Sequence, residues 1–139
     1  MKKITHNKLV RDRIPNILIG HGLSFKAHKC NDPDFIKELS SKLEEEAKEV
    51  SEKVHWYDHI TEVEPTSKGE DKAYISSITE EMADVLEVFV NLAKALNITT
   101  DEIEKAADKK RKERGGFEDR IFLEWSEDAN EAEKKGKLK

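Results

Sequence analysis

Cysteine, glycine, proline and long apolar runs are all scarce in this sequence. The single cysteine, Cys30, has no second cysteine to pair with in the chain, so the fold does not need an oxidising compartment. The 6 Gly and 3 Pro among 139 residues are too few for the many turns of a β-sandwich or barrel. Residues 85–96 form the most apolar stretch, which is interrupted by polar residues and too short to span a bilayer. These absences favour one helical domain outside the membrane.

Charged residues, in contrast, make up 40% of the chain, with a net charge of −5. A negative chain is a poor general binder of nucleic acid polymers, whose phosphates must be neutralised by cations. A local basic site for one nucleotide remains compatible with this balance. The charged first residues lack the apolar core of a signal peptide, so we expect a cytoplasmic protein.

Hydrophobic periodicity predicts an all-α fold with two long helices. The first should begin at residue 31 or 32 and run to about 54, with a proline in its first turn. The second should span about 71–96. Residues 55–70 lose the periodicity and are predicted to connect the two helices, with room for a helical turn of their own. Helices joined in this way are expected to pack antiparallel, as in a helical bundle.

Shorter elements are predicted on either side of this pair. A short helix should end near Gly20, and Thr99 and Glu102 form a capping-box pattern that opens a third helix, which two glycines should stop. Weak alternation near 25–30 and an apolar cluster near 120–125 allow short extended segments there.

Four carboxylates lie on or beside the predicted apolar stripes. At roughly 100° per residue, Glu46 falls in the middle of the stripe of the first long helix and Glu49 at its edge. Glu81 and Asp84 border the stripe of the second. A carboxylate facing a core is costly unless a cation or hydrogen bonds compensate its desolvation. Oxygen ligands alone suit Mg²⁺, or Mn²⁺, so the pattern predicts such a site. An isolated acidic run would instead be an ordinary solvated face.

Basic residues near the end of the third helix are candidates for binding phosphates. Lys110 and Arg114 are i, i+4 neighbours on the face that turns towards the core. We expect them to contact phosphates, because an acidic metal site needs nearby cations to hold a polyphosphate. For the other cations of this stretch, complementing the helix dipole is the favoured interpretation.

Glu45-Glu46-x-x-Glu49 followed by Glu81-x-x-Asp84 resembles the EExxE…ExxD signature of the MazG-like all-α nucleoside triphosphate pyrophosphohydrolases. The segments NKLVRDRIP and ERGGF…IFLE are similar to a branch labelled phosphoribosyl-ATP pyrophosphohydrolase-like. The resemblance predicts a single domain of this type over residues 1–126. The charged composition of residues 127–139 predicts a flexible tail there.

The resemblance also implies a reaction and an assembly. A metal-activated water would attack the α-phosphorus, giving a nucleoside monophosphate and pyrophosphate. Homodimers or homotetramers are expected, and the apolar flanks of the second long helix, with Leu86 and Val88, are predicted near the contacts between chains. The implied metal ligands are Glu46, Glu49, Glu81 and Asp84; the catalytic candidates are Glu45 and Glu46; the substrate-binding candidates are Lys110, Arg114, Lys8 and Arg11.

Three functions stay open on the sequence. The first is a house-cleaning enzyme that hydrolyses non-canonical or excess nucleoside triphosphates, and the second is phosphoribosyl-ATP hydrolysis in histidine biosynthesis. The third is a non-catalytic helical module that keeps the acidic residues only for structure or binds a partner protein. The intact acidic motifs favour an enzyme, because a degenerate site would be expected to have lost ligands.

Overall fold

The computed structural model describes residues 2–63, 68–134 and 136, with side chains described for 2–59, 71–131 and 136. Within these residues all regular structure is helical and no β-strand forms, which confirms the all-α prediction. The chain divides into two compact units, Met1–Ile103 and Glu104–Lys139. No helix within the described residues has both the length and the apolar character needed to cross a membrane.

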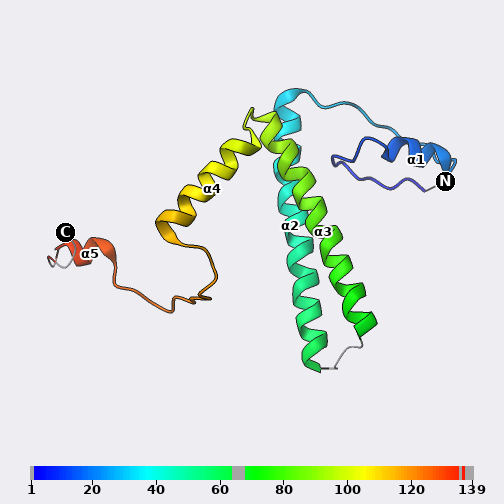
Figure 1. Cartoon of the computed structure of the whole chain (residues 1–139). Coiled ribbons are helices and arrows are strands. Elements are labelled where there is room, and N and C mark those ends of the chain that lie inside the picture. Colours follow the sequence, from blue (N-terminus) through cyan, green and yellow to red (C-terminus); the bar gives the residue numbers. More distant parts are fainter. Residues whose placement is uncertain (1, 64–67, 135, 137–139) are drawn as a thin grey trace. The chain divides into compact units, whose positions relative to one another are not determined.

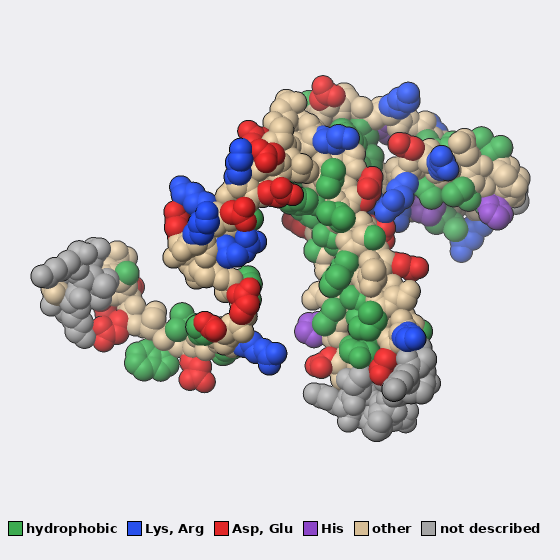
Figure 2. Space-filling model, viewed as in Figure 1, with side chains coloured by type: hydrophobic (Ala, Val, Ile, Leu, Met, Phe, Trp, Pro, Cys, Tyr) green, Lys and Arg blue, Asp and Glu red, His purple; other side chains and the backbone are tan. Residues whose placement is uncertain are grey.

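Two long helices form the core of the first unit, as the periodicity predicts. Helix α2 (Asp32–Val63) and helix α3 (Lys68–Ala95) pack side by side and run antiparallel (Figure 1). Hydrophobic side chains line the face of this pair that Figure 2 presents. The core is thin, because burial is confined to few apolar side chains among the described residues: Leu39, Ile78, Val88 and Ala93.

Helix α2 extends further than the hydrophobic pattern predicts. The connection expected over 55–70 is wrong for residues 55–63 and 68–70, which are helical; residues 64–67 lie outside the described part of the chain. The cause is a contact between the helices, because the ring of Tyr57 in α2 packs against that of Tyr74 in α3 at 5.9 Å between centroids. Aromatic packing therefore continues the helical pair past the end of the aliphatic stripe.

The N-terminal segment contains the predicted short helix, α1 (Ile14–Gly20), with Pro15 in its first turn and its end at the predicted glycine. Residues 23–31 then lead to α2 without a regular element, so the extended segment allowed near 25–30 does not pair as a strand. The N-terminal segment reaches the helical pair through Arg11, whose Nη2 donates to Oδ1 of Asp84 at 2.6 Å.

The third helix, α4 (Thr100–Arg114), begins and ends as predicted. The backbone N–H of Thr99 donates to Oε2 of Glu102 at 2.8 Å, and the N–H of Glu102 donates back to Oγ1 of Thr99 at 3.1 Å. This reciprocal capping box satisfies two N–H groups at the helix start. Gly115 ends the helix at a φ of +82°, a left-handed conformation that glycine adopts without strain.

Most of α4 belongs to the second unit, together with α5 (Ala129–Lys134), which lies inside the predicted tail. Between the two helices, the chain segment 117–128 contains neither helix nor strand, including the stretch 120–125. Its large apolar side chains are 73–97% exposed: Phe117, Ile121, Phe122, Leu123 and Trp125.

Candidate metal centre

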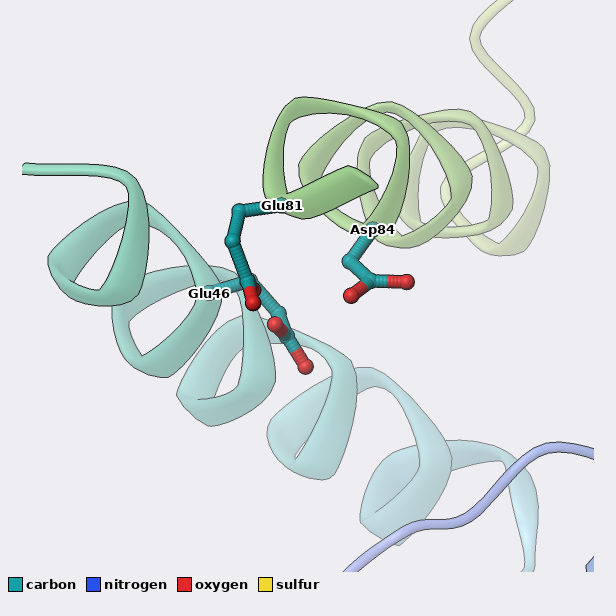
Figure 3. Close-up of side chains that lie close together, drawn as sticks. All are labelled: Glu46, Glu81 and Asp84. Carbon is teal, nitrogen blue, oxygen red and sulfur yellow. The ribbon is translucent and has the colours of Figure 1, made fainter. Parts of the chain in front are cut away.

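The packing of α2 on α3 gathers three of the four predicted carboxylate ligands. Glu46 comes from α2, and Glu81 and Asp84 come from successive turns of α3. Figure 3 shows the three side chains directed towards one another between the two helices. One oxygen from each lies within 4.8 Å of the others. A single divalent cation can be shared by three oxygens at that spacing, so this acidic cluster is a candidate metal centre.

Burial separates this cluster from an ordinary acidic surface. Glu46 is 7% exposed and shares its stripe of α2 with the buried Leu39. Oxygen Oε2 of Glu46 and Oε2 of Glu81 are both buried and accept no hydrogen bond. A buried carboxylate oxygen without a donor is strongly destabilising, and a cation is the partner that removes this cost without a donor group. The cluster thus has the acceptor capacity that a metal ion needs.

Glu49, the fourth predicted ligand, adjoins the cluster. Its pKa is raised from 4.5 to about 7, first by hydrogen bonding with Glu81, then by partial desolvation, and then by hydrogen bonding with and repulsion from Glu46. In the absence of metal, the crowding of these carboxylates therefore favours the neutral form of Glu49, which lowers the repulsion among them. This is consistent with the prediction that four converging acidic groups require a positive charge among them.

Each clustered carboxylate also has a cation on one of its oxygens. Lys53 lowers the pKa of Glu81 by hydrogen bonding, and the same bond raises the pKa of Lys53. These cations reduce the repulsion between the carboxylates. Each cation pairs with one oxygen of its carboxylate, so the other oxygen can bind a metal ion. The pairs and their N–O distances are Lys42–Glu46 at 3.3 Å, Lys53–Glu81 at 2.7 Å and Arg11–Asp84 at 2.6 Å.

Lys42 and Lys53 were not among the residues that the sequence predicts for the site. The sequence spacing could have predicted the contact of Lys42 with Glu46, since Lys42 lies four residues earlier on the same helical face. Lys53 lies four residues after Glu49, which suggests a pair within α2, yet its ammonium contacts Glu81 of α3. Arg11 was predicted to bind substrate, and its bond to Asp84 places it at the edge of the cluster.

The remaining predicted site residues are all exposed. Glu45 and Lys8 are exposed, and Glu45 is not among the described carboxylates that gather with Glu46. Lys110 and Arg114 are exposed in the second unit, so their contact with phosphates stays a prediction. Comparison of the chain with protein-family models, with curated proteins and with solved structures finds no match.

Proposed function

We propose that this protein is a divalent-metal-dependent nucleotide pyrophosphohydrolase of the MazG-like all-α type. One observation carries the proposal: Glu46 is buried between two helices, beside Glu81 and Asp84, with an oxygen that has no donor. The carboxylates of an ordinary acidic surface stay in water, whereas a metal site gathers buried carboxylates around the ion. The resemblance of the acidic motifs to the EExxE…ExxD signature supplies the reaction.

The described residues fit a hard divalent cation. Glu46, Glu81 and Asp84 would hold Mg²⁺ or Mn²⁺, with Glu49 as the adjacent fourth ligand, because all offer carboxylate oxygens. A bound metal ion of this kind lowers the pKa of water and stabilises charge on phosphates. The overall reaction would be hydrolysis of the α–β phosphoanhydride bond, releasing a nucleoside monophosphate and pyrophosphate.

The chain's own groups have separate tasks in this proposal. Lys42 and Lys53 hold one oxygen of Glu46 and one of Glu81. Arg11, whose side chain is more exposed than Asp84, is suited to move from Asp84 to a phosphate at the edge of the cluster. Glu49, with its pKa near neutrality, can hold or release a proton at its carboxyl group.

We propose excess or non-canonical nucleoside triphosphates in the cytoplasm as the substrates. Phosphoribosyl-ATP is the alternative substrate, and it is supported only by the flanking motifs NKLVRDRIP and ERGGF. A non-catalytic helical module is the alternative from another class, and the buried acidic cluster argues against it.

The two substrate classes and the non-catalytic module are distinguished by measuring pyrophosphate release from a panel of nucleotides that includes phosphoribosyl-ATP. The assay is run with Mg²⁺ and with Mn²⁺. The matched variants are Glu46→Gln in the cluster and Glu44→Gln in the same acidic run but exposed. We expect activity in the wild type and in Glu44→Gln, and its loss in Glu46→Gln. Absence of release from every nucleotide would reject the enzyme.

We also propose a homodimer or homotetramer. Helix α3 carries a row of apolar side chains with exposures between 40% and 62%: Ile75, Met82, Leu86 and Phe89. A helix with a second apolar face beyond its core stripe is expected to be buried on that side as well, and another copy can offer the same face. Val88, predicted near this contact, is already buried within the chain, so Leu86 is the better probe.

A further inference from the structure

Lys53 joins the two long helices at a point next to the acidic cluster. Its Nζ lies 2.7 Å from Oγ of Ser77 and 2.7 Å from Oε1 of Glu81. Both acceptors belong to α3 and are one helical turn apart, whereas Lys53 belongs to α2. Two bonds to one rigid helix hold the ammonium in place far better than a single exposed ion pair would.

The direction of approach matters for Glu81. Along α3 the order is Ser77, Glu81, Asp84, so an ammonium shared by the first two comes from the side away from Asp84. Lys53 thus donates a hydrogen bond to Oε1 of Glu81, while the other oxygen, Oε2, is buried with no donor. The free oxygen belongs to a carboxylate that lies within 4.8 Å of Glu46 and Asp84.

We propose that Lys53, held between Ser77 and Glu81, is a positioning residue that orients the Glu81 carboxylate for a divalent cation shared with Glu46 and Asp84. The inference deepens the proposed function and rests on it. Groups that hydrogen-bond a metal-ligating carboxylate determine its orientation and hence the affinity for the ion.

A different role for the same contact predicts the opposite result. If the Lys53 ammonium only balanced the charge of the carboxylates, its removal would abolish its repulsion of an incoming divalent cation. Metal binding would then strengthen. If Lys53 positions Glu81, its removal leaves the carboxylate free to rotate, and metal binding weakens. The sign of the change in affinity therefore separates the two roles.

The experiment is calorimetric titration of the full chain with Mn²⁺, without nucleotide. We expect Lys53→Met to weaken binding roughly 10- to 100-fold, and Lys53→Arg to restore most of the affinity. Ser77→Ala, which keeps both charges, should weaken binding in the same direction but less. The matched control is Lys48→Met, because Lys48 is exposed on the same helix and pairs with Glu52 at 3.7 Å.

The possible results distinguish failure of the positioning role of Lys53 from failure of the metal centre itself. If the wild type binds Mn²⁺ and folded Lys53→Met binds it equally or more tightly, the positioning role is wrong and the metal centre survives. If the wild type binds no Mn²⁺, the proposed function fails and the inference with it. Should Lys53→Met not fold by circular dichroism, Ser77→Ala decides, since unchanged affinity in that variant overturns the role.

Discussion

Helices α2 and α4 both carry many acidic and basic side chains, but these charges meet in different ways. In α2, Glu46 is buried and faces carboxylates of another helix, and Lys53 bonds across to α3. In α4, no residue is buried, and the ion pairs join neighbours one turn apart, such as Arg111–Asp108 at 2.6 Å. Exposed pairs of that kind contribute only about 0.3–0.5 kcal/mol each.

A charged motif indicates a binding site only when the groups that face it are known. An EExxE run on an isolated helix, like the charges of α4, would lie in water and require no ligand. The same run on α2 faces α3, and one oxygen of Glu46 in α2 and one of Glu81 in α3 are buried without a donor. Variants of the acidic cluster should therefore behave differently from variants of exposed charges of the same type.

The largest expected effect is the loss of hydrolysis on neutralising a cluster carboxylate. Asp84→Asn and Glu49→Gln should each lower the rate of pyrophosphate release more than about 100-fold, because each removes a charge from the proposed metal centre. Both variants should keep the fold or gain stability, since repulsion between crowded carboxylates falls. Asp108→Asn in α4 should keep the wild-type rate; unchanged turnover in Asp84→Asn would remove Asp84 from the site.

The next effect concerns assembly. Leu86→Arg should raise the concentration at which the oligomer dissociates at least tenfold, because a buried leucine side chain contributes about 1.5–3 kcal/mol at each site. Light scattering over a dilution series measures the change, with the exposed Leu23→Arg in the N-terminal segment as the control. An active wild-type monomer at micromolar concentration would contradict the proposed dimer.

A smaller effect is the pH dependence of stability without metal. The pKa of Glu49 is raised to about 7 in the folded chain, so folding favours its protonated form. Its contribution to stability is full below the ordinary pKa of 4.5 and is lost as the pH rises through about 7. Thermal unfolding should thus show a Tm that falls between about pH 5 and 8 in the wild type.

Glu49→Gln is the control for this slope, because glutamine does not titrate in that range. The fall in Tm should be smaller in Glu49→Gln, and Mg²⁺ should restore the Tm of the wild type most strongly above pH 7, where Glu49 is ionised. Identical pH profiles for the two proteins would show that Glu49 is not held protonated by its neighbours.

The smallest effect is expected in the basic stretch of α4. Lys110→Ala should raise KM several-fold with little change in Mn²⁺ affinity, whereas Lys112→Ala should leave both unchanged, because only Lys110 lies on the face predicted to contact phosphates. Steady-state kinetics and metal titration give the two quantities. Equal changes at both positions would indicate a diffuse electrostatic field instead of a phosphate contact.

The residues that short-range rules govern were predictable from the sequence. The capping box at Thr99 and Glu102, the left-handed Gly115 and the short helix ending at Gly20 depend on neighbours a few positions away. The burial of Glu46 was also predictable, since 3.6 residues per turn places it on the stripe of Leu39. Glu81 and Asp84 followed from the same periodicity on the second long helix.

Only the tertiary structure decided which groups meet across elements. Tyr57 on Tyr74 extended α2 beyond its aliphatic stripe, and Lys53 bonded to α3 instead of to Glu49. Arg11 reached Asp84 across 73 positions of sequence. Helical periodicity gives the face on which a side chain lies, but the partner depends on the register of one helix against the next. That register is set by the packing of the whole interface, which no local pattern encodes.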